Sequence, residues 1–337
     1  MRLLIWGAGA IGGTLGAYLI QAGHDITFVD RAAEHVAAIN QKGLTITGPI
    51  AEFTVPGVAF TPQELDGQWA VVLLCVKAQD TAAAALDIAP HLGPGGFIVS
   101  VQNGLNELEI AGVVGRERTV GSFVNFGADY LEPGLILYGG RGAVVLGELD
   151  GAISPRIQAL HSAFLDFDPN AIITENMWGF LWGKLAYGAQ LFATALTNES
   201  IADCLADPAY SDLYINLATE VLSVAAAQGI APEAFNGFDP HAFLPGTPWE
   251  VSQRSLDEMV AFNRKSAKTH SGIWRDLAVR KRRTEADAQL GPIVAAGKLA
   301  GIPTLLTAKV IELIHEIEAG QRPQQTANLD ELKALHG

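Results

Sequence analysis

The sequence contains little cysteine and little charge. Only two of its 337 residues are cysteines, Cys75 and Cys204, and both lie in apolar runs. A disulfide framework is therefore excluded, and buried thiols in a reducing compartment are expected. Charged residues make up 17% of the chain and hydrophobic residues 49%. This composition is too apolar for a disordered chain and rich enough to fill two cores.

Basic residues are the scarcer of the two charge types. The chain has 22 Lys and Arg against 36 Asp and Glu, and its net charge of −14 argues against any large nonspecific contact with nucleic acid. The uncharged stretch from Leu3 to Ile20 is interrupted by glycines, and no signal-peptide cleavage site follows it. We therefore expect a soluble, cytoplasmic protein with no membrane or nucleic-acid partner and no metal site.

Short β-rich runs alternate with helical stretches in the first part of the chain, which is typical of a parallel sheet covered on both faces. The predicted strands and helices are Leu3–Trp6, Ile11–Ala22, Asp25–Val29, a helix through about Asn40, Ala70–Val76, Phe97–Val101 and Thr119–Val124. The run Gly134–Leu149 resembles a hairpin that is broken at Gly139-Gly140.

The pattern becomes helical after about residue 170. Periodic apolar stretches predict helices over Tyr214–Gln228, Asp257–Lys268, Thr284–Ala300 and Thr307–Ala319. The fold class is therefore α/β in residues 1–170, followed by an all-helical domain in residues 171–337. Exposed apolar helices in the second domain would allow a homodimer.

A glycine-rich turn follows the first predicted strand and opens the first helix. It comprises Gly7, Ala8, Gly9, Ala10, Ile11 and Gly12. In this context the pattern is the fingerprint of a Rossmann-type dinucleotide-binding domain: the first glycine permits the tight turn, the second lets the pyrophosphate approach, and the third lets helix and strand pack closely. The pyrophosphate is expected at the positive end of the helix.

The second strand ends at Asp30 and Arg31. An acid here normally binds the adenosine ribose and repels a 2′-phosphate, which favours NAD. An arginine can instead bind that phosphate, which favours NADP. The residues themselves leave this choice open.

Lys184 is the only charged residue between Glu175 and Glu199, in a long apolar helix predicted over Asn176–Asn198. An ammonium group in an apolar setting loses hydration and its pKa falls, unless an anionic substrate and a carboxylate compensate. Such a lysine is a candidate proton donor. The alternative is a lysine whose stem covers apolar surface while its head reaches water.

A basic run extends from Arg264 to Arg283, in which Asp276 is the only acid. It could attract a substrate carboxylate or cofactor phosphates, but for most of its residues a solvated basic surface paired with acids elsewhere is the better explanation. Glu285 follows this run and is a candidate carboxylate partner for Lys184.

Together these features resemble the ketopantoate reductase family over nearly the full chain. The matching segments are GAGAIGG at 7–13, Val76-Lys77, Gln102-Asn103-Gly104, Trp182-Gly-Lys184-Leu, Thr284-Glu285-Ala-Asp287 and Gly301-Ile302-Pro303-Thr304. The resemblance implies reduction of a 2-keto acid by hydride transfer from NADPH, with the conversion of 2-dehydropantoate to pantoate in pantothenate biosynthesis as the family reaction.

The resemblance also implies residue roles. Lys184 would protonate the ketone oxygen, and Glu285 would anchor the lysine and the nicotinamide ribose or a substrate hydroxyl. Asn103 would contact cofactor and substrate, and Lys77 would lie along the cofactor. Arg31 would bind the 2′-phosphate, so that NADP is favoured, with NAD retained as an option because of Asp30. Ser271 would bind the substrate carboxylate.

The chain departs from the family where asparagines commonly bind the substrate. Four and eight residues after the lysine stand Gly188 and Phe192, and a third family asparagine corresponds to Ala202. Loss of these amides predicts that ketopantoate is a poor substrate and that a more hydrophobic 2-keto acid is preferred, unless Gln190 or Thr194 compensates.

Three alternatives remain at this stage. One is an NAD-dependent dehydrogenase of 3-hydroxyacids or sugar acids on the same scaffold. Another is a dinucleotide sensor without turnover, against which the combination of Lys184, Asn103 and Glu285 argues. A flavin enzyme is the third, although it usually has glutamate at the end of the second strand.

Overall fold

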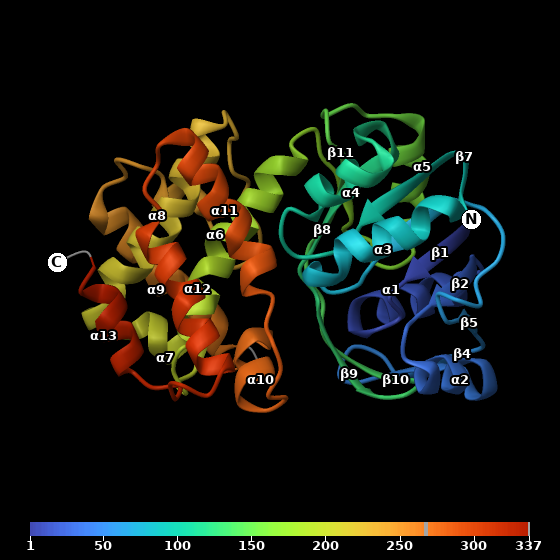
Figure 1. The fold of residues 1–337 in the computed structure, drawn as a ribbon, viewed down its shortest axis with the longest axis horizontal. Coiled ribbons are helices and arrows are strands. Elements are labelled where there is room, and N and C mark those ends of the chain that lie inside the picture. Colours follow the sequence, from blue (N-terminus) through green and yellow to red (C-terminus); the bar gives the residue numbers. More distant parts are fainter. Residues whose placement is uncertain (266–268, 336–337) are drawn as a thin grey trace. The chain divides into compact units, whose positions relative to one another are not determined.

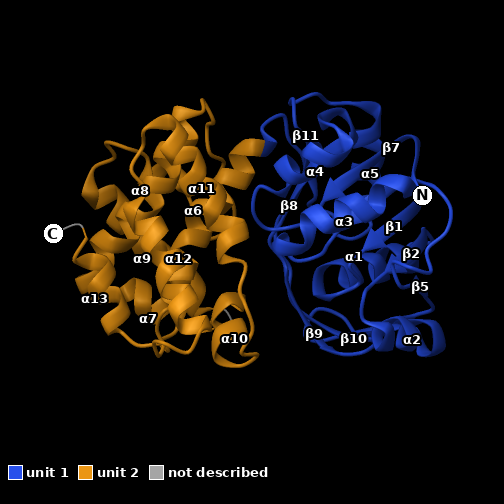
Figure 2. Cartoon of the chain, viewed as in Figure 1, with its two compact units in different colours: residues 1–177 blue, residues 178–337 orange. Residues whose placement is uncertain are grey.

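The computed structural model describes residues 1–265 and 269–335 (Figure 1). It divides into two compact units, residues Met1–Met177 and Trp178–Gly337 (Figure 2). Each unit has its own core and is described separately.

Unit 1 contains a sheet of eight strands in the order β12-β11-β8-β7-β6-β1-β2-β5. From β5 to β8 all neighbours are parallel, whereas β11 runs antiparallel to β8. The chain moves from β1 outward through β2 and β5, then returns to β6 on the other side of β1. This is the doubly wound order, and its switch point lies between β1 and β6. The strands are β1 Arg2–Trp6, β2 Asp25–Val29, β5 Val58–Phe60, β6 Trp69–Leu74, β7 Leu92–Ser100, β8 Thr119–Val124, β11 Val144–Glu148 and β12 Ile172–Ile173.

Helices cover the sheet of unit 1. Successive side chains of a strand point to opposite faces, and β1 shows the result: Leu3 and Ile5 join one buried cluster, whereas Leu4 and Trp6 join the other. Burial on both faces explains why these strands are continuous apolar runs. The helices are α1 Ala10–Gln21, α2 Ala33–Lys42, α3 Thr81–Ile88, α4 Asn106–Val114 and α5 Pro155–Phe164.

A second, four-stranded sheet of unit 1 has the order β4-β3-β10-β9. Its strands are β3 Leu44–Thr47, β4 Phe53–Val55, β9 Gly127–Glu132 and β10 Leu135–Gly140. α1 packs closely on it, because a side chain at Gly13 would collide with Ile136.

The predicted hairpin over Gly134–Leu149 is wrong. β10 pairs with β9 and β3 in the small sheet, whereas β11 pairs with β8 in the large one. The segment between them crosses from one sheet to the other, passing so close to the backbone of Asn125 that only glycine fits at Gly142. The alternation of side chains identifies two strands here but carries no information on their partners.

The described residues of unit 2 form helices and loops, with one isolated β-bridge between Phe235 and Phe238. The helices are α6 Met177–Thr194 (which starts at the last residue of unit 1), α7 Ile201–Ala206, α8 Ser211–Ala227, α9 Trp249–Arg264, α10 Gly272–Ala278, α11 Ala286–Ala300, α12 Leu305–Glu318 and α13 Ala327–Lys333. α8 lies at the centre of the core, with Leu217, Val221 and Leu222 fully buried. The long predicted helices correspond to α8, α9, α11 and α12, although residues 266–268 of one prediction lie outside the described residues.

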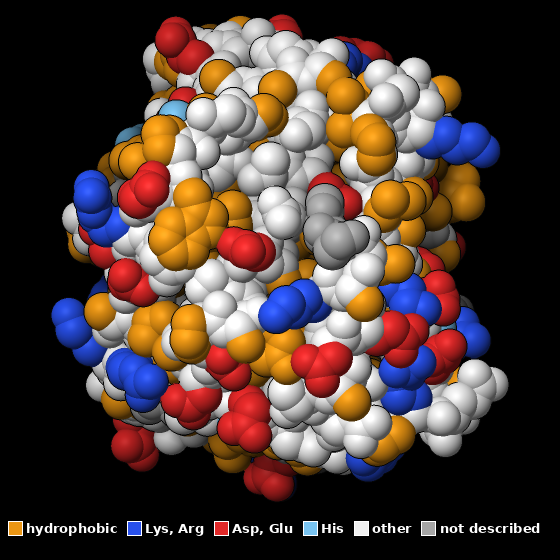
Figure 3. Space-filling view, turned by 90° about the vertical axis from the view of Figure 1, so that its left-hand side faces the viewer, with side chains coloured by type: hydrophobic (Ala, Val, Ile, Leu, Met, Phe, Trp, Pro, Cys, Tyr) orange, Lys and Arg blue, Asp and Glu red, His pale blue; other side chains and the backbone are white. Residues whose placement is uncertain are grey.

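The surface of the protein is mixed in character. On the face in Figure 3, acidic and basic side chains are interspersed with small groups of apolar ones. Within the part of the chain that the structure describes, no helix is both long and apolar enough to cross a membrane.

Candidate active site

The glycine turn lies at the switch point of the large sheet. Gly7 has φ +101°, a conformation that favours glycine, and its N–H donates to the carbonyl of Val29 at 2.7 Å. A Cβ at Gly7 would lie 2.9 Å from the carbonyl carbon of Cys75, just beyond β6. The turn is therefore fitted against the ends of β2 and β6, where open α/β sheets bind their ligands.

Gly9 and Gly12 differ in what surrounds them. A Cβ at Gly12 would collide with the carbonyl oxygen of Gly7 and with the side chains of Ile5 and Cys75, whereas a Cβ at Gly9 would meet nothing within 4 Å. Gly9 is also the N-cap of α1 and offers no side chain to the free N–H groups of the first turn. Open space before an uncapped helix N-terminus fits a pyrophosphate.

Asp30 is part of the turn itself. Its carboxylate accepts hydrogen bonds from the backbone N–H of Ala8 at 2.9 Å and of Ala32 at 3.0 Å. Fully buried His35 supports the same turn: its Nδ1 accepts from the N–H of Gly134 at 3.0 Å, so its Nε2 donates to the carbonyl of Ala8 at 2.9 Å. Sequence reasoning did not single out His35.

The two basic residues predicted at the cofactor lie on exposed loops of unit 1. Arg31 is 79% exposed and its Nη1 lies 3.2 Å from Oδ1 of Asp80. Lys77 is exposed and precedes a short 3₁₀ turn that includes Asp80. The two loops they occupy follow β2 and β6, on either side of β1.

Asn103 is exposed, but the loop that carries it is held by buried amides. Gln102 donates to the carbonyl of Val76 at 2.9 Å and to the hydroxyl of Thr81 at 2.7 Å. Thr81 donates to Asn106 at 2.8 Å, and Asn106 donates to the carbonyl of Asn103 at 2.8 Å. This network joins the loops after β6 and β7 and so fixes the positions of Lys77 and Asn103 relative to each other.

Glu107 is a fully buried acid in the first turn of α4, and within the described residues neither carboxyl oxygen has a hydrogen bond of good geometry. Burial raises its pKa to about 8, and the neighbouring Ser100 hydroxyl lowers it only in part. The native state therefore holds this proton more tightly than the unfolded state does.

We expect the unfolding free energy to fall as the pH rises from about 4.5 to about 8, by at most about 1.4 kcal/mol per pH unit from this group. Glu107→Gln should remove that slope and be more stable than the unchanged protein above pH 8. Urea unfolding at a series of pH values measures this, with exposed Glu109→Gln as the control. Parallel curves for the protein and Glu107→Gln would contradict the assignment.

In unit 2, α6 holds Lys184 in a buried setting. Its neighbours Leu181, Trp182 and Leu185 are at most 2% exposed, whereas Lys184 is partly exposed. The loop before α9 packs closely on the helix, because a Cβ at Gly183 would lie 2.6 Å from the carbonyl oxygen of Glu233. The predicted apolar helix is confirmed, although it ends at Thr194 and not at Asn198.

The residues one and two turns after Lys184 differ in exposure. Gly188 is partly exposed, whereas Phe192 is fully buried. A substrate contact by the Phe192 ring would require its covering side chains to move. Gln190 is also fully buried and donates to the carbonyl of Tyr214 at 3.0 Å, and Thr194 donates to the carbonyl of Leu191 at 2.9 Å. The amide nitrogen of Gln190 and the hydroxyl of Thr194 are thus used inside the helical core, whereas Oε1 of Gln190 is buried with no hydrogen-bond partner among the described residues.

Glu285 stands directly before α11 as its N-cap and is partly exposed. The preceding Thr284 is anchored by Glu318 of α12, which accepts from its N–H at 2.7 Å and its hydroxyl at 2.8 Å. Ser271, 4% exposed, is the N-cap of α10, and its Oγ accepts from the N–H of Trp274 at 3.1 Å. Its hydroxyl hydrogen has no acceptor among the described residues.

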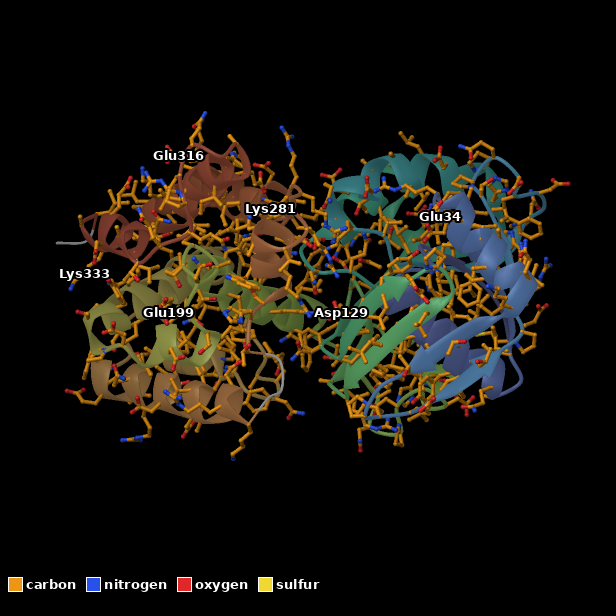
Figure 4. The ribbon with its side chains drawn as sticks, turned by 90° about the horizontal axis from the view of Figure 1, so that it is seen from below. Glu34, Asp129, Glu199, Lys281, Glu316 and Lys333 are labelled. Carbon is orange, nitrogen blue, oxygen red and sulfur yellow. The ribbon has the colours of Figure 1, made fainter. Side chains whose placement is uncertain are left out.

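The basic run is neutralised only in part where the structure describes it, and Lys268 lies outside the described residues. Buried Asp276 accepts from Arg280 at 3.1 Å and from Arg282 at 2.9 Å, and Arg264 pairs with Asp203 at 3.3 Å. Lys281, labelled in Figure 4, is the one non-glycine residue of the described chain with positive φ, at 49°. The surface role expected for most of this run holds for these arginines.

The doubly wound sheet with its glycine turn defines unit 1 as a Rossmann-type dinucleotide-binding unit, and unit 2 is helical. Family models agree with this class. Residues 3–151 match "Ketopantoate reductase PanE/ApbA" and residues 176–318 match its C-terminal counterpart. The chain belongs to the ketopantoate reductase family and is an oxidoreductase of that family.

Individual relatives agree over nearly the whole chain. A 2-dehydropantoate 2-reductase of Archaeoglobus fulgidus is 28% identical over 95% of this chain and 98% of its own. The crystal structure of a ketopantoate reductase from Ralstonia eutropha JMP134 superposes with a TM-score of 0.80 at 25% identity, covering 95% of this chain and 99% of its own. A D-mandelate dehydrogenase with NADH and anilino(oxo)acetate shares the fold, with a TM-score of 0.83 at 23% identity and the same coverage.

Proposed function

We propose that this protein reduces the ketone of a 2-keto acid to a hydroxyl group, with Lys184 as the general acid. The observation that carries the proposal is one partly exposed lysine, the only charged side chain of a largely buried apolar helix. Family membership supports the same reaction. A bound nicotinamide would supply the hydride.

In this proposal the residues of the chain bind, orient and transfer a proton. The Lys184 ammonium donates its proton to the ketone oxygen as negative charge develops there, which lowers the barrier to reduction. Glu285 keeps Lys184 charged and orients it. Ser271 donates its free hydroxyl hydrogen to the substrate carboxylate, and Asn103 binds cofactor and substrate.

The reaction is tested by mixing the purified protein with NADPH or NADH and a panel of 2-keto acids, ketopantoate among them, while recording the absorbance of the reduced nicotinamide. Oxidation that depends on the keto acid, with the 2-hydroxy acid as product, is expected. Tight cofactor binding without turnover of any 2-keto acid would instead favour a sensor.

We propose NADPH as the preferred cofactor. Both carboxylate oxygens of Asp30 accept hydrogen bonds from backbone N–H groups, so this acid stabilises the glycine turn. The neighbouring Arg31 is 79% exposed and can approach a 2′-phosphate.

Arg31→Ala should raise KM for NADPH by about 10-fold or more, because a charge-assisted hydrogen bond contributes about 1.5–3 kcal/mol, and should leave KM for NADH nearly unchanged. Steady-state kinetics with both cofactors measure the two values, and exposed Arg254→Ala serves as the control. Equal loss with both cofactors, or a preference of the unchanged protein for NADH, would contradict this choice.

A further inference from the structure

A glutamine of α11 lies opposite the position where α6 lacks a side chain. Lys184 and Gly188 are four residues apart and therefore share one face of α6. Glu285 and Gln289 are likewise one turn apart, since the N–H of Gln289 donates to the carbonyl of Glu285 at 2.9 Å. A Cβ at Gly188 would have Oε1 of Gln289 as its nearest contact, at 4.0 Å.

The side chain of Gln289 is mostly buried, and no described residue uses its amide. The residue is 9% exposed, and its side chain has no hydrogen bond to any described residue. Gln190, the other buried glutamine of this region, instead donates to a backbone carbonyl of the core. The amide atoms of Gln289 are not fully enclosed, so they are accessible to a ligand that can donate to them or accept from them.

We infer that Gln289 is a specificity-determining residue, whose amide binds a hydroxyl group on the substituent of the 2-keto acid. This inference rests on the proposed function. An amide can donate and accept, as a hydroxyl can, whereas a carboxylate only accepts. In this inference α11 supplies the amide that α6 lacks at Gly188. The absence of an asparagine at position 188 is then no reason to expect a 2-keto acid with a purely apolar substituent.

The test compares ketopantoate with trimethylpyruvate, which has the same skeleton without the hydroxyl. Gln289→Met keeps the length of the side chain and removes the amide. The ratio of kcat/KM for ketopantoate to that for trimethylpyruvate should fall about 10- to 100-fold, mainly through KM for ketopantoate. Gln289→Leu provides a second variant if Gln289→Met folds poorly by circular dichroism.

Two further variants separate binding from structure. Gln190→Met removes a buried amide from the core and should leave the substrate ratio unchanged even if stability falls. Adding Gly188→Asn to Gln289→Met returns an amide from α6 and should restore most of the ratio, because the space at Gly188 is open to a side chain.

An unchanged ratio in an active Gln289→Met enzyme would overturn the inference. Turnover of trimethylpyruvate but not of ketopantoate by the unchanged protein would also overturn it, while leaving the proposed reaction intact. Turnover of no 2-keto acid would reject the proposed function and this inference with it.

Discussion

Lys184→Ala should lower kcat for 2-keto acid reduction by about 10²- to 10⁴-fold, since this is what a positioned general acid contributes. Affinity for NADPH should change little, because the glycine turn and Arg31 belong to unit 1 and do not depend on this side chain. The expected pattern is therefore loss of turnover with retention of cofactor binding.

Single-turnover kinetics and a fluorescence titration with NADPH measure the two quantities. Lys184→Arg is an informative companion, because it keeps the positive charge but holds its proton too tightly to donate it. Lys298→Ala, an exposed lysine on α11, is the control. Turnover by Lys184→Ala within a few-fold of the unchanged protein would remove Lys184 from the chemistry.

The glycine turn gives the second large effect, and it separates binding from folding. Gly9→Ala should weaken NADPH binding by about 10- to 100-fold, because its methyl group occupies the open space that the pyrophosphate needs. Its unfolding free energy should stay within about 0.5 kcal/mol, since the methyl group meets no protein atom within 4 Å.

Gly12→Ala should both weaken NADPH binding and destabilise the protein, by about 1–3 kcal/mol or more, because its methyl group collides with the backbone of Gly7. Urea unfolding and NADPH titration of both variants measure the contrast. Gly112→Ala in α4, where a Cβ also meets nothing within 4 Å, is the control for substitution in open space. Unimpaired NADPH binding by Gly9→Ala would show that the pyrophosphate does not pass over this residue.

Local sequence patterns were sufficient to predict most helices and strands, the glycine turn and the position of Lys184. The strands Asp25–Val29 and Thr119–Val124 were predicted to the residue, because an apolar run flanked by polar residues shows where a buried strand begins and ends. The spacing of the glycines at 7–12 predicted the turn, because the first glycine is required by its backbone conformation and the third by a close contact. Lys184 was found because a single charge in an apolar helix needs a specific reason.

Contacts between distant segments were decided only by the tertiary structure. The periodicity of Gly134–Leu149 showed two strands but not that they join different sheets. The amide network behind Asn103 and the burial of Phe192 likewise depend on which elements pack together. Gln289 lies about a hundred residues from Gly188, and it became a candidate only when the packing of α6 and α11 placed its amide there. The sequence by itself determined the secondary structure and the glycine turn, because both follow from short-range backbone and hydrophobic preferences. The residues around the proposed substrate depend on how helices pack, which no local pattern encodes.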